Sequence, residues 1–540
     1  MARIETITSG SWNFAPALWE SSNRMRGKMD AAQYRQLLIP LLWLKYITES
    51  YRFHEGETRH HNRLNSGSSD RYWVPEISTW EYVTSHASPE STVPIGEVIN
   101  NAFIALSENK PSAVQQAYKF FARGYHDLDT ESNKILSQLI TLYSGDVSKG
   151  GLPNFFEAGA ENSQDLLGYI YEYFTGKFAQ LEKRGGEFYT PKSVVKLLVD
   201  MLQPFDGDIY DGCCGTGGMF FQDKKLKEHL REKKFKIFGQ EANAFTWSCA
   251  VMNMEYNRLD YDVGIHNQDT LLQPLHRKEK MGYCITNPPF NLSKWDAEKV
   301  GSDSRWLDIP DDSNPPPSDE KIMSDLICDS NANFAWIQHH LSQLRKNGMA
   351  GVVMSNSCLS TNKKEEKAAR KAIILEDKLD CVVMLPNKLF TNTGISACLI
   401  ILANDKSSDE RYRSREGETL FIDCRNMIGN MLTRTLRELV DDELSKIATT
   451  YANWRSRDNY DSYRDDSGFC KQVTTAEEIL SHDYNIVPGR YVGPAAVLPD
   501  DEDFNTKMGR LTQELGNLMK KQKSMDSKIR ESMKELGYEY

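Results

Sequence analysis

The sequence lacks the features that mark several common protein classes. No stretch approaches the ~18 consecutive apolar residues that a membrane-spanning helix needs, and the N-terminus does not have the basic-then-apolar order of a secretory signal. The ten cysteines are scattered and form no C-x-x-C pair, the pattern typical of zinc and redox sites. These absences predict a cytoplasmic protein with reduced thiols, no membrane partner and no bound metal.

Two nucleotide-binding signatures are also missing. The chain has no G-x-G-x-x-G motif and no P-loop lysine after its glycine-rich turn, which argues against dinucleotide and ATP binding. A formal net charge of -11 at pH 7 argues at first sight against nucleic acid, because Lys and Arg contacts to phosphate supply most non-specific affinity. Basic clusters do occur at residues 224–236, 363–371 and 411–415. Such runs are more often solvated helix faces than DNA contacts, and each could still face a duplex.

The pattern of apolar residues divides the chain into three regions. With 540 residues, the chain is large enough for several domains. Apolar residues at helical spacing, as in YRQLLIPLLWLKYITESYRF, predict a helical N-terminal domain over residues 1–160. Strand-like runs such as KIFGQE, YCITNPPF and DCVVMLP then alternate with helical segments, which predicts an α/β domain with a parallel sheet over residues 161–490. Residues 491–540 are predicted to form a C-terminal helical tail.

Two segments are predicted to lie outside the core. Residues 291–321 are polar, acidic and Pro-rich, which favours a long loop that ligand or DNA binding would order. The charged helix from Asp503 onward has no core of its own, which makes it a candidate docking element for a partner protein. Its apolar side carries Met508, Leu511, Leu515, Leu518 and Met519.

The most specific local signal is Asn287-Pro288-Pro289-Phe290, directly after the strand-like YCIT. The lone pair of an exocyclic base amine is delocalised into the ring, so the nitrogen is a poor nucleophile until fixed acceptors hold its two N–H groups. The Asn287 side-chain oxygen and the Pro288 carbonyl, held rigid beside Pro289, are suitable acceptors. Phe290 would stack on a base that has left the duplex. These four residues are therefore the catalytic candidates.

The tripeptide alone is a weak signal, because Asn-Pro-Pro also makes ordinary turns. A second copy, Asn314-Pro315-Pro316, lies in the acidic loop with no strand before it, and we interpret that copy as linker. The first copy is distinguished by the motifs that precede it in the chain.

A glycine-rich turn lies upstream of the tripeptide. The strand-like IYD ends at Asp211, and the turn that follows contains Gly215, Thr216, Gly217 and Gly218. Glycines here let the backbone approach a ligand closely at the end of a strand, where open α/β sheets bind cofactors. The turn is therefore a candidate cofactor site.

Two acidic strand ends complete the series. Glu241 follows the next strand and could take both hydroxyls of a ribose, although such an acid more often caps a helix. Asp269 and Thr270 follow a later strand, where the acid suits an adenine amine. Found together in this order, the glycine turn, the two acids and the Asn-Pro-Pro-Phe motif form a much more specific signal than any one of them alone.

Together these motifs resemble the modification subunit of type I restriction-modification systems, within the adenine-N6 class of DNA methyltransferases. GGEFYTP resembles that family's cofactor motif before the sheet, YDGCCGTGG its glycine motif, and GQEANAFTWSCAVMNM its ribose-binding strand and helix. NQDTL and NPPF resemble its adenine-binding and catalytic motifs, and LPNKLFTNTGISACLIIL resembles a wall of its target-base pocket. LWESSNRMRGKMDAAQYRQLLIPLLWLKYI resembles its helical N-terminal domain.

The resemblance implies a Rossmann-like methyltransferase sheet that uses S-adenosylmethionine to methylate the N6 amine of an adenine flipped out of double-stranded DNA. It also implies a separate specificity subunit that contacts the terminal helix, a second copy of this chain, and a restriction subunit that can join them. The GGEFYTP motif adds four residues to the cofactor site: Glu187, Phe188, Tyr189 and Thr190.

The sequence departs from the family pattern at two places. Gly212 follows the motif aspartate, where proline is common, and this could loosen the cofactor loop. Ser357, Cys358 and Leu359 stand where the family often has a turn with Pro and Gly.

Other functions fit parts of the same pattern. A solitary adenine-N6 DNA methyltransferase would recognise DNA with its own C-terminal region, residues 405–500. The same tripeptide with an aromatic residue also serves methylation of glutamine amides in proteins and of some RNA amines, which the helical N-terminal domain and the late motifs disfavour. A scaffold that only binds cofactor is disfavoured because Asn287, Phe290 and Glu241 are intact.

Overall fold

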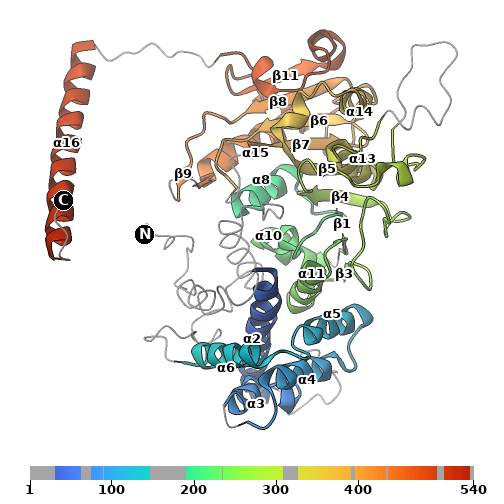
Figure 1. Ribbon diagram of the computed structural model, residues 1–540. Coiled ribbons are helices and arrows are strands. Elements are labelled where there is room, and N and C mark those ends of the chain that lie inside the picture. Colours follow the sequence, from blue (N-terminus) through green and yellow to red (C-terminus); the bar gives the residue numbers. More distant parts are fainter. Residues whose placement is uncertain are drawn as a thin grey trace. The chain divides into compact units, whose positions relative to one another are not determined.

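The computed structural model describes residues 31–61, 74–88, 91–145, 152, 190–233, 235–307, 326–390, 396–432, 436–494 and 504–535. The chain forms two compact units, residues 1–492 and residues 493–540, and Figure 1 shows the elements of both. Residues 187–189 of the predicted cofactor site and the second Asn-Pro-Pro copy lie outside the described ranges.

The N-terminal part of the first unit is helical, as predicted. Its helices are α2 (Ala31–His61), α3 (Trp80–His86), α4 (Ile95–Ser107), α5 (Ser112–Arg123) and α6 (Thr130–Tyr143). Apolar residues at spacings of three and four bury one face of α5, including Val114, Tyr118 and Phe121. The same face contacts α11 (Ala244–Tyr256), where the rings of Phe121 and Phe245 lie 6.0 Å apart. This contact joins the helical part to the α/β part.

The α/β part is built on a nine-stranded sheet in the order β11-β8-β6-β7-β5-β4-β1-β2-β3. Seven strands are parallel to one another, whereas β7 and β11 run antiparallel to their neighbours. The strand bounds are β1 Ile209–Asp211, β2 Ile237–Gly239, β3 Tyr261–Asp262, β4 Met281–Thr286, β5 Leu344–Ser355, β6 Leu379–Met384, β7 Ala397–Ala403, β8 Glu418–Asp423 and β11 Cys470–Thr474. The mostly parallel α/β sheet confirms the predicted fold class.

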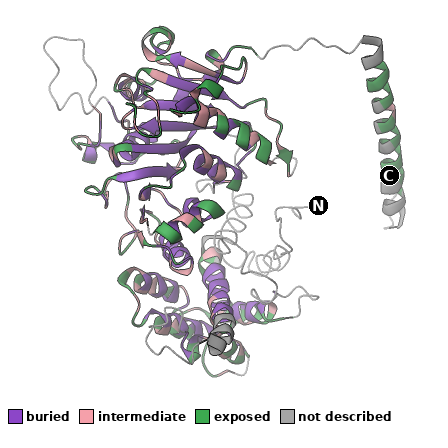
Figure 2. Cartoon of the chain, turned by 180° about the vertical axis from the view of Figure 1, so that it is seen from behind, coloured by how far each residue is buried: buried purple, intermediate pink, exposed green. Residues whose placement is uncertain are grey.

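Helices cover both faces of the sheet, and the central strands are buried (Figure 2). Alternate side chains of β5 point to opposite faces, so that Met349 and Val353 join one core and Ala350 and Val352 the other. The first core includes α8 (Lys192–Leu202), α10 (Lys224–Lys233), α11 and α15 (Asp441–Arg455). The second core includes α13 (Asn333–Ser342) and α14 (Lys364–Leu375). Continuous apolar runs such as YCIT follow from burial on both faces.

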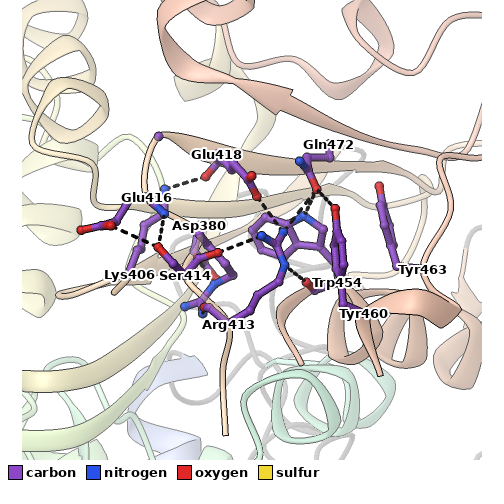
Figure 3. Close-up of polar contacts among 12 residues, drawn as sticks. Asp380, Lys406, Arg413, Ser414, Glu416, Glu418, Trp454, Tyr460, Tyr463 and Gln472 are labelled. Carbon is purple, nitrogen blue, oxygen red and sulfur yellow. Dashed lines mark hydrogen bonds and ion pairs between the residues drawn. The ribbon is translucent and has the colours of Figure 1, made fainter. Parts of the chain in front are cut away.

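Residues 405–494 are integrated into the main sheet, because they provide β8, β11 and α15. A polar network fixes them there (Figure 3). Arg415 pairs with Asp380 at 2.9 Å and both side chains are buried. Arg413 donates to Glu418 at 2.7 Å and to the Trp454 carbonyl at 2.7 Å. The basic cluster at 411–415 therefore makes internal ion pairs, and the idea that it faces a duplex is wrong for Arg413 and Arg415.

The segment after β4 differs from the predicted loop. Residues 291–307 contain the short 3-10 helix η4 (Ala297–Val300) and bury Trp295, Arg305 and Trp306, each 5–6% exposed. The Trp306 indole N–H donates to the Val300 carbonyl at 2.7 Å. These buried side chains were not expected in a polar stretch, and they make this part of the segment a component of the core. The remaining residues of the predicted loop, from 308 onward, lie outside the described ranges.

The second unit contains the predicted terminal helix, α16 (Phe504–Glu535). Its apolar side chains Met508, Leu511, Leu515 and Met519 are 42–57% exposed. Across the described parts of both units, no helix combines the length and the apolar character needed to cross a membrane.

Candidate functional site

A cavity of about 360 Å³ lies at the carboxyl ends of β1, β2 and β4. β1 stands between β2 and β4, so the chain leaves β1 on one side and later returns to the other side. Open α/β sheets bind ligands at such a switch point. The cavity is lined by Thr190, Asp211, Gly212, Cys213, Cys214, Gly215, Thr216, Gly218, Met219, Gln222, Glu241, Ala242, Thr246, Asp269, Thr270, Asn287, Pro288, Pro289, Leu292 and Trp336.

The turn after β1 needs glycine at two positions for different reasons. Gly215 has a φ of 57°, and a Cβ atom there would meet no heavy atom within 4 Å, so its backbone faces open space. Gly217 has a φ of 88°, and a Cβ atom there would lie 2.9 Å from the Phe221 ring. The turn is closed by the Gly217 N–H, which donates to the Cys214 carbonyl at 2.8 Å. A ligand can therefore contact the backbone of this turn without side chains between.

Glu241 is held at the cavity by the turn itself. Its Oε2 atom accepts a hydrogen bond from Gly215 N at 3.1 Å, and its Oε1 atom accepts one from Asn243 N at 2.7 Å. The carboxylate is thus oriented by backbone donors from two different elements. A carboxylate that lines a cavity in a fixed orientation can accept hydrogen bonds from a pair of ligand hydroxyls.

Asp211 braces the turn against β4. The residue is 1% exposed, and its Oδ1 atom accepts from the Thr286 hydroxyl at 2.6 Å and from Cys213 N at 3.0 Å. Burial raises the pKa of Asp211 to about 6, and the two hydrogen bonds act against this rise. Because Thr286 directly precedes Asn287, these hydrogen bonds tie the predicted cofactor turn to the predicted catalytic motif.

The two cysteines of the turn are not nucleophiles. Cys213 and Cys214 both line the cavity. Burial raises the pKa of each thiol well above its usual range, and the nearby Asp211 carboxylate acts in the same direction. Both sulfurs are therefore protonated near neutral pH, and covalent catalysis through a thiolate does not fit this site.

Asn287 presents an amide oxygen without a partner. Its Nδ2 atom donates to the Thr190 hydroxyl oxygen at 2.9 Å. Its Oδ1 atom is buried and has no hydrogen-bond partner among the described residues. A buried acceptor left open in this way is costly unless a ligand satisfies it. Thr190 therefore fixes the amide in the orientation that leaves its oxygen available to a donor.

Phe290 lies beside this cavity without lining it. Its ring contacts that of Phe390 edge to face, with centroids 6.2 Å apart and planes at 72°. Phe390 follows β6, and the carboxyl end of β6 lies at the same sheet edge as that of β4. The predicted catalytic motif therefore divides between two places, with Asn287, Pro288 and Pro289 in the cavity and Phe290 toward the end of β6.

Asp269 and Thr270 are placed at the cavity, but part of each side chain has a structural partner. Asp269 Oδ1 accepts from Leu271 N at 2.9 Å and from Leu272 N at 3.0 Å. The Thr270 hydroxyl donates to the Gly212 carbonyl. The Asp269 bonds stabilise its own turn, and the Thr270 bond joins that turn to the turn after β1.

A histidine supports the turn at the position where the family pattern has proline. Gly212 N donates to His340 Nε2 at 3.1 Å, while His340 Nδ1 donates to the Trp336 carbonyl at 2.8 Å. Since Nε2 accepts, His340 is neutral, and burial lowers its pKa to about 4. Proline has no N–H group and could not make this bond. The hydrogen bond thus compensates for the conformational freedom of Gly212.

Arg305 and His339 form a second support, behind the turn that carries Asp269 and behind β1. Arg305 donates to the carbonyls of Thr270 at 3.2 Å and Leu271 at 2.6 Å, and to His339 Nδ1 at 3.0 Å. Because arginine can only donate, His339 Nδ1 accepts, and its Nε2–H donates to the Tyr210 hydroxyl at 2.8 Å. Burial lowers the pKa of His339 well below its usual range. This buried set links β1, the Asp269 turn, α13 and the segment after Asn287.

The structure thus brings together most of the predicted site and adds residues that the sequence reasoning missed. The predicted residues that line the cavity are Thr190, Asp211, Gly215, Thr216, Gly218, Glu241, Asp269, Thr270, Asn287, Pro288 and Pro289. Gly217 and Phe290 lie next to it, and Glu187, Phe188 and Tyr189 are outside the described ranges. Trp336, Arg305 and His340 were missed. His340 supports Gly212 from 128 positions away and Arg305 supports Thr270 from 35 positions away. The only available signal was a pair of histidines within an apolar helix.

Two protein families match this sequence. The family described as N-6 DNA Methylase matches residues 162–500, and the family described as HsdM N-terminal domain matches residues 14–142. The type I restriction enzyme HindI methylase subunit of Haemophilus influenzae is 40% identical over 380 residues, which cover 70% of this chain and 80% of that protein. The type I restriction enzyme MjaIX methylase subunit of Methanocaldococcus jannaschii is 29% identical, with 97% of this chain and 92% of the relative covered.

A solved structure has the same fold. The methyltransferase subunit of the type I restriction-modification system from Streptococcus thermophilus aligns with a TM-score of 0.65 and 23% identity. The alignment covers 88% of this chain and 98% of that chain. The likeness therefore extends over the helical part as well as the sheet.

Proposed function

Because this chain belongs to the N-6 DNA methylase family, among the methylase subunits of type I restriction-modification systems, we propose that it methylates the N6 amine of adenine in DNA with S-adenosylmethionine. The observation that supports this most directly is the buried Asn287 oxygen without a partner, at the edge of a cavity bounded by a glycine turn. The donors and acceptors around that cavity suit both the cofactor and the target amine.

The cavity residues fit S-adenosylmethionine. The Glu241 carboxylate would accept the two ribose hydroxyls, and the open backbone at Gly215 would face the cofactor. Asp269 would accept from the adenine amine of the cofactor, as its position at the cavity allows. When bound, this cofactor supplies an electrophilic methyl group on a sulfonium. Glu187, Phe188 and Tyr189 remain proposed members of the same site.

Asn287 and the Pro288 carbonyl would activate the target nitrogen. The Asn287 Oδ1 atom, fixed by the Thr190 hydroxyl, would accept one N–H of the adenine amine, and the Pro288 carbonyl would accept the other. Two fixed acceptors draw the nitrogen toward tetrahedral geometry and return its lone pair from the ring. Acceptors positioned before the reaction stabilise the charge that develops on nitrogen in the transition state. Phe290 would stack on the adenine after it leaves the duplex.

Target recognition is assigned to a separate specificity subunit. Residues 405–494 provide β8 and β11 of the main sheet and the helix α15. This argues against an independent recognition module there. We propose that the exposed apolar side of α16 contacts the specificity subunit and that two copies of this chain join the assembly, to which a restriction subunit can add. We also propose the domain limits 1–160, 161–490 and 491–540. A solitary adenine methyltransferase is the alternative.

Transfer of labelled methyl groups tests the proposal. The chain alone and the chain co-expressed with its genomic neighbours are compared on mixed-sequence DNA, and the modified base is identified by mass spectrometry. N6-methyladenine that forms only with a partner supports a catalytic subunit with separate specificity. Robust transfer by the chain alone supports the solitary enzyme. No adenine methylation in either preparation contradicts the proposed activity.

A further inference from the structure

The turn that follows the Asn-Pro-Pro-Phe motif is held by a set of three asparagines. Asn291 comes directly after Phe290, and its backbone N–H donates to Asn333 Oδ1 at 2.9 Å. The Asn291 side-chain oxygen accepts from the amide nitrogen of Asn333 at 3.0 Å and from that of Asn331 at 3.1 Å. Asn333 N donates to Asn331 Oδ1 at 2.9 Å. We call these four hydrogen bonds the asparagine clamp.

Asn333 is the centre of the clamp. Its side chain is fully buried, and that of Asn331 is almost so, whereas Asn291 is exposed. Because a backbone N–H can only donate, the Asn333 oxygen must face Asn291 N, and its amide nitrogen is then left to donate to the Asn291 oxygen. The orientation of the Asn333 amide is therefore fixed by its two bonds to one residue.

The clamped turn has an unfavourable backbone conformation. Asn291, Lys294 and Asp296 all lie in the left-handed region, with φ of 55°, 57° and 60°. Residues other than glycine rarely adopt this conformation. Lys294 is held in it by its N–H group, which donates to the Asp329 carbonyl at 2.8 Å. Strained backbone persists where surrounding contacts determine it, and such residues are concentrated at functional sites.

The clamp fixes the catalytic motif at its end, as β1 does at its start. Before the motif, the Thr286 hydroxyl is bonded to the last residue of β1. After the motif, the bond from Asn291 N fixes the peptide that joins Phe290 to Asn291. Between these points, the rings of Pro288 and Pro289 restrict the backbone. The Pro288 carbonyl and the Phe290 ring are therefore left with little freedom.

The clamp also lies next to the cavity. Leu292, which follows Asn291, lines the cavity, and its carbonyl accepts from Ala332 N at 2.8 Å. On the other side of Phe290, Pro289 lines the same cavity. The clamped turn is thus part of the cavity wall.

The helix that begins at Asn333 supports the predicted cofactor turn as well. Trp336 of α13 lines the cavity, and His340 of α13 accepts a hydrogen bond from Gly212 N at 3.1 Å. Residues three and seven positions apart lie on one face of a helix. The same face of α13 therefore holds the turn after the motif and the turn after β1 at a fixed separation. Methyl transfer depends on such alignment, since a small misplacement of reacting groups slows a reaction strongly.

We propose that Asn333 is a positioning residue for methyl transfer, which fixes the Pro288 carbonyl and the Phe290 ring relative to the bound cofactor. This assignment rests on the proposed function, in which these two groups hold the target adenine. Asn333 acts through the turn that it clamps. Its removal should therefore leave the cofactor bound and slow the transfer step itself.

The test measures single-turnover methyl transfer by the full complex, assembled on DNA that carries its target sequence and saturated with S-adenosylmethionine. The rate constant reports alignment, and the amplitude reports the fraction of active enzyme. Asn333→Ala removes the centre of the clamp. Asn133→Ala is the matched control, because the Asn133 side chain on α6 also accepts a backbone N–H, from Gly96 at 2.8 Å, and donates to the Leu128 carbonyl at 2.8 Å. Cofactor affinity is measured on the same preparations.

Two substitutions at the exposed end of the clamp decide the question even if Asn333→Ala does not fold. Asn291→Gly accommodates a φ of 55° and removes the side-chain acceptor. Asn291→Asp keeps an oxygen that can accept from both neighbouring amides. The two variants thus differ in whether the clamp can form.

The rate constant of Asn333→Ala is expected to fall about ten- to a hundredfold, with amplitude and cofactor affinity unchanged. Asn291→Gly should lose about tenfold, whereas Asn291→Asp should retain most of the wild-type rate and Asn133→Ala all of it. A normal rate constant with a reduced amplitude, a parallel loss of cofactor affinity, a matching loss in Asn133→Ala, or equal rates in the two Asn291 variants would each overturn the proposal. Absence of wild-type transfer would instead contradict the proposed function.

Discussion

Arg305 offers a quantitative test of how the turn that carries Asp269 is supported. Replacing it with methionine keeps a long side chain and removes every donor. The carbonyls of Thr270 and Leu271 and the Nδ1 atom of His339 then lose their donor, and Asp303 loses an ion pair at 3.1 Å. A buried acceptor without a partner costs ~1–3 kcal/mol. Because these groups can relax together, we expect the free energy of unfolding to fall by about 3–5 kcal/mol, the usual cost of breaking a buried ion pair.

The chain supplies its own control for this substitution. Arg277 pairs with the same Asp303 at 2.5 Å, but its side chain is 49% exposed, whereas that of Arg305 is 5% exposed. Arg277→Met should therefore cost less than about 1 kcal/mol. Urea unfolding measures both values, and titration with S-adenosylmethionine below the unfolding transition should show weaker binding for Arg305→Met alone. Equal effects of the two substitutions on stability and cofactor affinity would refute the structural role given to Arg305.

Three further predictions concern the site itself. Thr190→Val should lower kcat about tenfold or more, because Asn287 loses the acceptor that orients it, whereas Thr190→Ser should retain activity in the same transfer assay. Glu241→Gln should weaken cofactor binding about tenfold or more in calorimetry, because a neutral amide accepts weaker hydrogen bonds, while the rate at saturating cofactor changes less. His340 has a folded pKa of about 4, below its usual 6.5, so only the unfolded chain binds its proton between these values. The free energy of unfolding of the wild type, relative to that of His340→Asn, should therefore be highest above pH 6.5. It should fall by up to about 3 kcal/mol as the pH is lowered toward 4. Urea unfolding at a series of pH values measures this difference. Asp211, whose raised pKa of about 6 has the opposite effect over much of this range, is common to both proteins and cancels in the comparison.

Motif order was enough to predict most of the cavity. Strands that alternate with helices form a parallel sheet, and parallel strands end at one edge, so residues directly after the strands must converge. Asp211 ends β1, Asn287 directly follows β4 and Glu241 comes two residues after β2, and all three line the cavity. Asp269 also lines the cavity, although it lies seven residues after the end of β3. The helical N-terminal part was equally visible from its spacing of apolar residues. Phe290 shows the limit of this reasoning, because its side chain turns toward Phe390 and not into the cavity.

Contacts between distant segments could not be predicted from the sequence. Arg305 lies in a stretch whose polar, Pro-rich composition suggested an unordered loop, yet it is buried against His339, which is 34 residues away. The cluster at 411–415 looked like a surface patch, and only the fold places Arg415 against Asp380. A charge that is buried with a partner has the same sequence signature as one in water, so composition alone does not separate the two.

Gly212, which replaces the proline of the family pattern, is a second case of a contact between distant segments that the sequence does not reveal. The sequence suggested a looser turn where the family pattern has proline. The Gly212 N–H instead donates to His340, a bond that joins residues 128 positions apart. A Cβ atom at Gly212 would lie 3.0 Å from His340 Nε2, so the two residues fit closely together. Neither residue alone indicates this pairing.

The central claim is that Asn287 activates the adenine amine, and one measurement tests it most directly. Methyl transfer to adenine by the assembled complex is compared between the wild type and Asn287→Ala, with S-adenosylmethionine affinity measured on the same preparations. We predict a loss of about 10²–10³-fold in kcat, as expected when a fixed hydrogen-bonding group is removed from a transition state, together with unchanged cofactor affinity. Transfer that survives in Asn287→Ala at a wild-type rate would contradict the claim.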